Sequence, residues 1–349
     1  MARRPDQPED APGQATIHDV ARVAGVSTGT ISRYLNRRGY VGAESARRIE
    51  EAIAATRYVP NSSARGLNTG RSGLLALILT DMENPFNAEF AQGMISRSLA
   101  LGFQPLIDIT QGTAQGALRA LHAARGRRVE GIVIASSDAP EIDDELARLT
   151  TSGVPVTLIG ATPDPGAADS VTSDTYGGAR QAMEHLLELG HRRIAFIGAG
   201  SSRRIASGRR AGYERALEEA GIPFAREIVV EGELDARAGA EALEYLLKLR
   251  DQPTAIFAAN DAAALGVIQQ AARSSIVVPR ELSVVGFDDV ALASHSTPML
   301  TTVHQRIRTM GATSAELLSE RITGEATGDG RTVRLDCRLV VRASTAAPA

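Results

Sequence analysis

Two kinds of hydrophobic spacing divide this chain of 349 residues. Near the N-terminus, apolar residues recur every three or four positions, as they do on one face of a short amphipathic helix. Ile17, Val20, Ala21 and Ala24 make the first such stripe. Residues 43–57 carry another, with Ala46, Ile49, Ile53 and Ala54 on the inward face. The N-terminal part of the chain therefore predicts a small group of short helices.

From Ser72 onward, short apolar runs alternate with longer amphipathic segments. This alternation is typical of βαβ units, in which helices cover both faces of a parallel sheet. The runs are too numerous for one compact sheet, so we expect two lobes. The predicted strands are Leu74–Leu79, Pro105–Ile109, Gly131–Ile134, Val156–Ile159, Ile194–Ile197, Ala255–Ala258 and Ser283–Gly286. The predicted helices include 87–101, 177–189, 208–220, 236–250 and 262–272.

The first two N-terminal helices are predicted to meet at a glycine turn. Thr16 can cap the start of the first helix, and Asp19 can return a hydrogen bond from the first turn. Gly25 supplies the permissive backbone that a sharp turn needs. Ser27 is placed to cap the second helix, so this stretch predicts two short helices bent around Gly25.

The second helix has one apolar face and one polar face. Ile31 and Leu35 lie four residues apart on the apolar face. A face that carries hydroxyl groups, an arginine and an asparagine can contact base edges and phosphates in the DNA major groove. A solvated helical hairpin would show the same spacing, so the pattern alone leaves both interpretations open. The polar or small positions are Thr28, Gly29, Ser32, Arg33 and Asn36.

Charge is distributed unevenly along the chain. Residues 16–71 hold nine arginines, no lysine and four acidic residues, which gives this stretch a net charge of +5. The whole chain has a formal net charge of −3, so the remainder carries −8. A basic module joined to an acidic body is typical of a protein that places one end on DNA.

Residues 58–71 are predicted to join these two parts. Pro60 ends the third helix, and Asn61 can cap a very short helix over 62–68. A helix of this length is unstable alone in water, and Gly66 weakens it by about another 1 kcal/mol relative to alanine. The alternative to a short helix in this segment is a plain linker that happens to contain a leucine.

A dense and ordered set of residues runs through this N-terminal part: Asp19-Val20-Ala21, Ala24-Gly25-Val26-Ser27, Thr30, Ser32-Arg33, Leu35-Asn36, Tyr58, Pro60-Asn61, Ala64-Arg65 and Leu67. With these residues, 16–71 resembles the DNA-binding headpiece of the LacI–GalR family of bacterial transcription regulators. In that family the joining segment becomes helical when two copies meet in the DNA minor groove, where a leucine wedges between base pairs. By resemblance, that leucine is Leu67.

The resemblance also implies which residues contact DNA. Thr28, Gly29 and Arg33 occupy the main base-reading positions, and Gly29 has no side chain, so Thr28 and Arg33 are expected to carry more of the specificity. Further contacts are implied for Thr16, Ser27, Thr30, Ser32, Asn36, Asn61 and Ala64.

A second set of residues runs through the body of the chain: Asn84-Pro85-Phe86, Asp174, Leu189-Gly190-His191, Arg209, Gly212-Tyr213, Asn260-Asp261, Ala264, Gly266, Val285-Gly286-Phe287-Asp288-Asp289, Pro298, Leu300-Thr301-Thr302-Val303, Leu339-Val340-Val341-Arg342 and Ser344-Thr345. These residues resemble the effector domain of the same family, which is similar to type I periplasmic binding proteins. The resemblance implies an α/β body of two lobes, with parallel sheets covered by helices. Ligands in such folds lie between the lobes, at the carboxyl ends of the strands.

Composition and resemblance together predict five parts of the chain. Residues 1–14 are expected to form a disordered tail, 15–60 the helix-turn-helix domain and 61–72 the hinge. The N-terminal lobe of the effector domain is expected to comprise 73–172 plus 305–334. The C-terminal lobe is expected to comprise 173–304 plus 335–349.

Five side chains are candidates for ligand binding: Phe86, Asp174, Arg209, Asn260 and Asp288. Phe86 can stack on a sugar ring or a base, Arg209 offers a rigid fork of donors, and the other three suit hydroxyl groups. The family most often binds a sugar, and less often a nucleobase or nucleoside. Structural roles are the alternatives: Asp288 can cap a turn, Phe86 can belong to the core, and Asn260-Asp261 can cap the helix at 262.

No other motif in the sequence predicts catalysis, a cofactor or a metal site. Gly198-Ala199-Gly200 follows a predicted strand, but Arg203 stands where a dinucleotide-binding loop has its third glycine. The six histidines lack metal-ligand spacing, and Cys337 is the one cysteine. A lone cysteine suits a reducing cytoplasm, and the sequence has no apolar run of the length that a membrane span requires.

The predicted function is that of a cytoplasmic, nucleoid-associated transcriptional repressor without enzymatic activity. It is expected to bind a pseudo-palindromic operator in double-stranded DNA as a homodimer, under the control of a small sugar-like effector. A solute-binding transport protein would share the two-lobed body but would need an export signal. A nucleotide-dependent enzyme would need a phosphate-binding loop or a catalytic cluster, and the sequence predicts neither.

Overall fold

The computed structural model describes residues 15–35, 39–58, 71–135, 140–160, 168–198 and 204–349. The chain divides into two compact units, Met1–Ser72 and Gly73–Ala349. Several predictions fall outside the described residues: the tail over 1–14, the short helix over 62–68, and the DNA contacts of Asn36, Asn61, Ala64 and Leu67.

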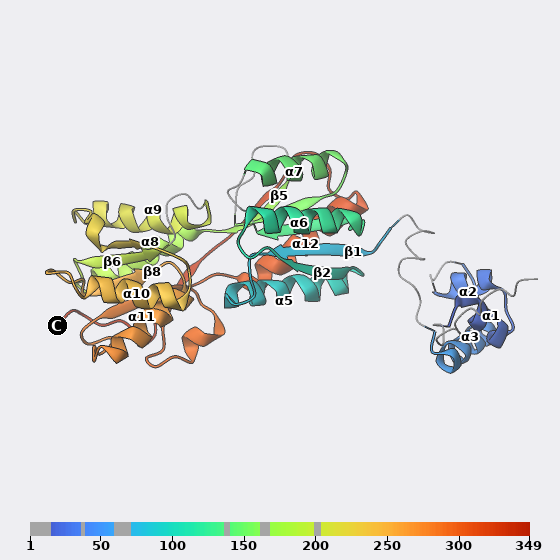
Figure 1. The fold of residues 1–349 in the computed structure, drawn as a ribbon, viewed down its shortest axis with the longest axis horizontal. Helices are drawn as coiled ribbons and strands as arrows, with labels where there is room; N and C mark the ends of the chain where they lie inside the picture. The colour runs from blue at the N-terminus through green and yellow to red at the C-terminus, as the bar shows by residue number, and fades with distance from the viewer. Residues whose placement is uncertain (1–14, 36–38, 59–70, 136–139, 161–167, 199–203) are drawn as a thin grey trace, which may run out of the picture. The chain divides into compact units, whose positions relative to one another are not determined.

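Three helices form the described part of the N-terminal unit, which is drawn in blue in Figure 1: α1 (Ile17–Ala24), α2 (Thr28–Leu35) and α3 (Ala43–Thr56). The predicted pair of short helices and the third helix are therefore confirmed. Their apolar faces meet in one small core, in which five side chains are buried. These side chains are Val20, Ala24, Ile31, Ile49 and Ala52.

The start of α1 and the turn after it are built as the sequence predicts. Asp19 N–H donates to Thr16 Oγ1, and Thr16 N–H donates to the Asp19 carboxylate, which completes a capping box. Hydrogen bonds from Thr16, with a further one from Arg22, lower the pKa of Asp19 to about 2. Gly25 has φ +63°, and a Cβ there would lie 2.3 Å from Nη2 of Arg48, which donates to the Gly25 carbonyl. The turn therefore requires glycine for its backbone and for the approach of Arg48.

The buried face of α3 differs from the prediction at one position. The pattern predicts Ala46, Ile49, Ile53 and Ala54 inside, but Ala54 is exposed and Ala52 is buried in its place. Ala52 shares a face with Ile49 because it lies three residues further on. Ala54 lies five residues from Ile49, about 140° around the helix, so it points to solvent.

The first lobe of the second unit is built on a six-stranded parallel sheet with the order β11-β5-β4-β3-β1-β2. Its strands are β1 (Leu74–Leu79), β2 (Gln104–Ile109), β3 (Gly131–Ala135), β4 (Val156–Ile159), β5 (Asp169–Ser173) and β11 (Thr332–Leu335). Its helices are α5 (Pro85–Ala100), α6 (Ala114–Gly126), α7 (Pro140–Thr151) and α12 (Ile307–Thr323). Alternate residues of β1 face opposite layers: Leu77 packs with α5 and α12, and Ile78 with α6 and α7.

The second lobe is also built on a six-stranded sheet, with the strand order β12-β10-β9-β8-β6-β7. Its strands are β6 (Ile194–Gly198), β7 (Val229–Glu231), β8 (Ala255–Ala258), β9 (Ser283–Asp288), β10 (Thr301–His304) and β12 (Arg338–Val340). The edge strand β12 pairs antiparallel with β10, and the other pairs are parallel. Its helices are α8 (Thr175–Glu188), α9 (Arg204–Glu219), α10 (Ala236–Leu246) and α11 (Asp261–Arg273), with short 3-10 turns η1 (Arg226–Ile228) and η2 (Ala291–Ser294).

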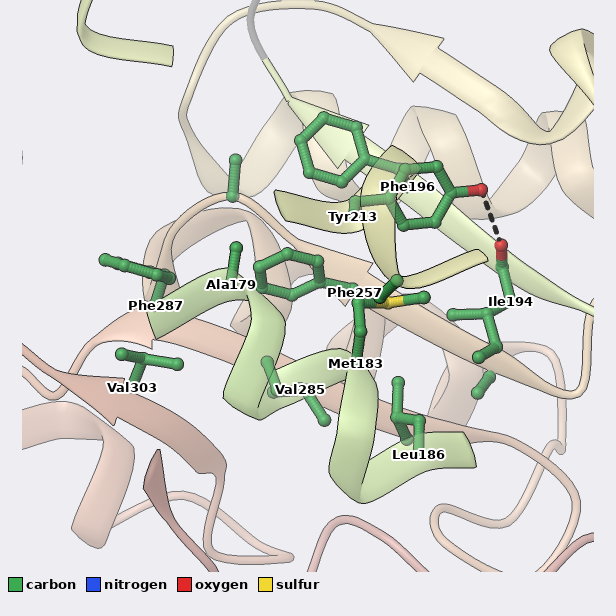
Figure 2. Packing of buried hydrophobic residues seen from close by; sticks show 14 of the residues in the cluster. Ala179, Met183, Leu186, Ile194, Phe196, Tyr213, Phe257, Val285, Phe287 and Val303 are labelled. Carbon is green, nitrogen blue, oxygen red and sulfur yellow. Dashed lines mark hydrogen bonds between the residues drawn. The ribbon is translucent and has the colours of Figure 1, made fainter. Parts of the chain in front are cut away.

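A group of aromatic rings lies in the core of the second lobe (Figure 2). The ring centroid of Phe196 lies 5.2 Å from that of Tyr213 and 5.6 Å from that of Phe257, which lies 6.4 Å from Phe287. The buried hydroxyl of Tyr213 donates to the Ile194 carbonyl at 2.9 Å, so this polar group is satisfied inside the core. Phe287 directly precedes Asp288, so the aromatic core extends to one of the predicted ligand-binding residues.

The chain passes between the two sheets three times, within 173–175, 304–307 and 335–338. The second passage leads into α12, which packs against α5 through two glycines. A Cβ at Gly93 would lie 2.0 Å from the Arg308 carbonyl oxygen, and one at Gly311 would lie 2.2 Å from the Phe90 carbonyl oxygen. Helix backbones come this close where no side chain separates them, so α5 and α12 form one closely fitted pair.

The seven predicted strands are confirmed, with ends that differ by at most two residues. The two-lobed α/β fold class is confirmed as well. Five further strands, β5, β7, β10, β11 and β12, were not predicted, because they are short or polar and lack an apolar run. The sequence of β5, for example, is Asp-Ser-Val-Thr-Ser. Such strands form because the lobe supplies neighbours with which their backbones pair.

Asp169, at the start of β5, ties three segments of the first lobe together. Its buried carboxylate accepts hydrogen bonds from Arg321 on α12 and from Arg331 next to β11, each at 2.8 Å. Burial alone would raise the pKa of Asp169, but the hydrogen bonds from Arg321 and Arg331 outweigh that effect and lower it to about 2. The folded state therefore favours the charged form of the Asp169 carboxyl group more than the unfolded state does.

Replacing Asp169 with asparagine is expected to lower the free energy of unfolding at pH 7 by about 3 kcal/mol, because two guanidinium groups lose their shared carboxylate. Since the folded-state pKa lies below the ordinary value of 3.8, this stabilisation is complete at neutral pH and is lost as the pH falls through about 2. Urea unfolding of both proteins measures the effect. The difference should stay constant between pH 7 and pH 5 and shrink at pH 3. A difference that grows on acidification contradicts the assignment.

Candidate DNA-binding face and ligand site

The predicted DNA contacts within the described headpiece lie on α2 and at the start of α1. Thr16 precedes α1 as its N-cap, and the remaining positions run from the residue before α2 to its last turn. The exposed members of this set are Thr16, Ser27, Gly29 and Arg33, and the half-buried members are Thr28, Thr30 and Ser32.

Local hydrogen bonds organise the first turn of α2. The Thr30 N–H donates to Ser27 Oγ at 3.1 Å, so the predicted cap by Ser27 is confirmed. Arg33 donates to Thr30 Oγ1 at 3.3 Å and to the Gly29 carbonyl at 3.4 Å. These bonds are long and exposed, so they hold the guanidinium of Arg33 weakly and leave it able to turn to another acceptor.

Gly29 occupies an open position on this face. A Cβ built there would meet only Ser27 Oγ, at 3.6 Å, which is an ordinary contact. In this respect Gly29 differs from Gly25, where the backbone and Arg48 both exclude a side chain. The fold does not require glycine at 29, so the missing side chain matters for what the face can contact rather than for how α2 packs.

Arg209 and Asp288 meet in the second lobe, as a buried ion pair. The Arg209 Nη2 lies 3.3 Å from Asp288 Oδ1, Nη1 donates to the Ala259 carbonyl at 2.6 Å, and the guanidinium carbon lies 4.3 Å from the ring centroid of Phe287. Gln305 donates to the same Oδ1 at 2.6 Å. Among the described residues, the buried Nε of Arg209 has no hydrogen-bond partner. The structure therefore brings together two of the five predicted ligand-binding residues and leaves one donor of the guanidinium available.

The backbone and the electrostatics of Asp288 are both unusual. Its φ is +120°, in a region that residues with a side chain rarely adopt, and such strain concentrates at functional sites. Burial raises the pKa of Asp288 to about 6, even though Arg209 and Gln305 act to lower it. Near neutral pH, Asp288 and its neighbour Asp261, whose pKa is also raised, therefore carry less negative charge together than two ordinary carboxyl groups would.

Asp261 is a second buried carboxyl group close to this pair. Burial and the charge of Asp288 hold the pKa of Asp261 well above its usual range. Its Oδ1 accepts from the Thr302 hydroxyl at 2.5 Å, and its Oδ2 accepts from the Val290 N–H at 2.9 Å. A Cβ at Gly286 would lie 2.3 Å from Asp261 Oδ1, so the glycine in β9 makes room for this carboxyl group.

Asn260 has the structural role that the sequence left as an alternative. Its Oδ1 accepts from the Ala263 N–H at 2.9 Å and so caps α11, while its Nδ2 donates to the Leu234 carbonyl at 2.8 Å. The side chain is buried. Any contact of Asn260 with a ligand would have to add to these two bonds or replace one of them.

Phe86 and Asp174 belong to other elements, and in the described part of the chain no hydrogen bond, ion pair or ring contact joins them to Arg209 or Asp288. Phe86 is half-buried in the first turn of α5, stacks on Phe90 at 6.5 Å between centroids, and packs against the core of the first lobe. Asp174 caps α8 by accepting from the Gly177 N–H at 3.0 Å, and it pairs with Arg334. It lies within a passage between the sheets. Burial raises the pKa of the Cys337 thiol to about 12, and the charges of Arg209, Asp174 and Asp288 also influence that pKa.

Three further residues of the site are not among the ligand-binding candidates that the sequence predicts. Gln305 follows the unpredicted strand β10, so nothing local indicated that it reaches Asp288. From the sequence, Asp261 is expected as part of the effector-domain motif and as a helix cap, not as a residue of the site. Its placement as a charged residue between apolar segments is the available signal. Phe287 lies within the motif around Asp288, but its contact with Arg209 depends on the position of α9.

Neither a membrane helix nor a metal cluster is found in the described parts of the chain. No helix there is both long and apolar enough to cross a membrane. The same residues contain no group of three or more histidine, cysteine, aspartate or glutamate side chains that could hold a metal ion.

Comparison with known proteins agrees with these features. Residues 16–61 match the family model described as bacterial regulatory proteins, lacI family, and residues 183–345 match a periplasmic binding protein-like domain. The HTH-type transcriptional regulator DegA of Bacillus subtilis (strain 168) is 34% identical over 333 residues, which are 95% of this chain and 98% of that protein.

Two solved structures extend the similarity to three dimensions. A lac repressor dimer bound to operator and the anti-inducer ONPF has a TM-score of 0.84 at 29% identity, covering 96% of this chain and 100% of that chain. The transcriptional regulator CelR in complex with cellobiose has a TM-score of 0.72 at 31% identity, covering 95% of this chain and 99% of that chain. The headpiece and the two-lobed body thus define a DNA-binding transcriptional regulator with an effector domain. The chain belongs to the lacI family of bacterial regulatory proteins.

Proposed function

We propose that this protein is a repressor that binds a pseudo-palindromic operator as a homodimer in the cytoplasm and responds to a sugar-like effector. The observation that carries the proposal is similarity along nearly the whole chain to a dimer bound to its operator. The exposed polar face of α2 and the excess of arginine in the headpiece support the same function.

In this proposal each headpiece recognises one half-site with α2 in the major groove. Thr28 and Arg33 contact base edges, because the open position at Gly29 offers no side chain between them. Thr16, Ser27, Thr30, Ser32 and Asn36 bind the backbone around them, and Asn61, Ala64 and Leu67 occupy the minor groove between the half-sites. Two copies are needed because a two-fold operator presents the same contacts twice.

The effector is proposed to bind at the Arg209–Asp288 pair. The unpartnered Nε of Arg209 is a donor, and Asp288 Oδ2, which has no hydrogen bond among the described residues, is an acceptor. One guanidinium and two carboxyl groups with raised pKa values give the site little net charge, which suits a neutral hydroxyl-bearing molecule. Phe86, Asp174 and Asn260 are proposed to complete the site, and the cellobiose bound to CelR gives a precedent for a sugar.

Replacing Arg33 with alanine is expected to weaken binding to a duplex selected by the wild-type protein by about 1–3 kcal/mol, because contacts with base edges are lost. Fluorescence anisotropy at fixed salt measures the two affinities. Arg47, which pairs with Glu51 on α3, provides a control that removes the same charge. The Arg47→Ala variant should lower affinity for selected and random duplexes equally. Unchanged affinity of the Arg33→Ala variant contradicts the proposed role.

A sugar that binds the effector site is expected to raise the unfolding temperature of the wild-type protein, with a stabilisation of about 2.7 kcal/mol at one hundred times its Kd. Thermal unfolding with ribose, cellobiose and other mono- and disaccharides, and with nucleosides, measures the shift. Asp288→Asn should abolish it, because an amide has a single acceptor oxygen, and Arg209 and Gln305 already donate to one oxygen of Asp288. Asp251→Asn, at the exposed pair with Arg193, should retain it. A shift that persists in Asp288→Asn argues against the site, and a shift given by nucleosides alone argues against a sugar.

A further inference from the structure

The segment 288–291 belongs to the second lobe in sequence but reaches into the first. Asp288 ends β9 of the second sheet. Two residues later, the side chain of Val290 is 3% exposed and belongs to the hydrophobic core of the first lobe, together with Phe90 on α5 and Ile307 on α12. A ligand-site residue and an apolar anchor in the other lobe are thus separated by a single residue.

Carboxyl groups from opposite lobes accept hydrogen bonds from two successive amides of this segment. Asp261 on α11 accepts from the Val290 N–H at 2.9 Å. Glu89 on α5 accepts from the Ala291 N–H at 3.3 Å. The second carboxylate oxygen of Glu89 lies 4.0 Å from the Arg308 guanidinium on α12. The Val290 N–H is therefore hydrogen-bonded to the second lobe, and the Ala291 N–H is hydrogen-bonded to the first.

The charge of Glu89 also reaches the ligand site. Burial is the largest influence on the pKa of Asp288, and the negative charge of Glu89 raises that pKa further. Glu89 therefore stays close to another carboxyl group although the two repel each other. The Ala291 N–H and the Arg308 guanidinium offset this repulsion, so Glu89 is held by its partners and is not simply a solvated surface residue.

The element that carries Glu89 is not free to move alone. Gly93 lies one helical turn after Glu89 and places the backbone of α5 against that of α12, and Gly311 makes the second close approach. A displacement of 288–291 would therefore be passed through Glu89 and Val290 to both helices together, because their backbones cannot separate without losing this fit.

We propose that Glu89 is a positioning residue that fastens the end of β9 in the second lobe to α5 in the first, and so sets the relation between the lobes at the ligand site. The inference rests on the proposed function only in assigning Asp288 to the effector. A bound molecule that shifts Asp288 would change the seating of Val290 and Ala291, and α5 and α12 would respond.

Hydrogen–deuterium exchange of the full chain, without DNA or effector, tests the proposal. In the Glu89→Ala variant, the amides of Val290 and Ala291 should exchange about tenfold faster, while those of β1 keep their wild-type protection. Glu316→Ala is the matched control, because it removes the Arg97–Glu316 pair, which joins the same two helices at 2.8 Å without contacting 288–291. Its exchange at 290–291 should equal that of the wild-type protein.

Two results overturn the proposal: unchanged exchange at 290–291 in Glu89→Ala, or equal acceleration in Glu316→Ala. If the alanine variant loses protection in β1 as well, Glu89→Gln decides. That variant keeps the shape and one acceptor oxygen but loses the charge, so its exchange at 290–291 should rise by about threefold, and an unchanged rate contradicts the role of Glu89. Because DNA is absent, these outcomes do not depend on operator binding.

Discussion

The effector domain depends on satisfying two carboxyl groups that are buried at the carboxyl ends of its central strands. A charge removed from water must be paired and hydrogen-bonded, and here the partners come from distant parts of the chain. Arg209 on α9 and Gln305 in the passage after β10 donate hydrogen bonds to Asp288. The Thr302 hydroxyl and the Val290 amide donate to Asp261. The strand ends, one passage between the lobes and the anchor in the first lobe are therefore positioned by the same small set of bonds.

The two units of the chain solve different physical problems. The headpiece buries only a handful of apolar side chains and relies on local devices, namely the Thr16–Asp19 box, the Ser27 cap and the Gly25 turn under Arg48. A small domain buries a smaller fraction of its surface on folding, so caps and turns make a larger relative contribution to its stability. The described residues of the effector domain form four extensive apolar clusters around two sheets. This domain can accommodate the strained backbone of Asp288 and the Arg209 Nε, which has no hydrogen-bond partner among those residues.

The sequence predicted what local pattern can encode. Apolar runs located the central strands, and caps located the headpiece helices, because both depend on neighbours in the chain. Polar strands such as β5 and β10 were missed, since their pairing partners are supplied by the rest of the lobe. At the site, Arg209 and Asp288 were selected and do meet, whereas Asn260 and Asp174 are engaged as helix caps. Gln305 and Glu89 could not be found from the sequence, because their roles depend on how two lobes pack.

The central claim is that paired headpieces recognise a two-fold symmetric sequence. Selection from a pool of random duplexes with the purified full-length protein at physiological ionic strength, followed by competition binding against unselected duplex, tests it most directly. The account predicts enrichment of an inverted repeat that is bound about 10³-fold or more tightly than random duplex. A selected pool without inverted symmetry, or one bound no more tightly than random duplex, contradicts it.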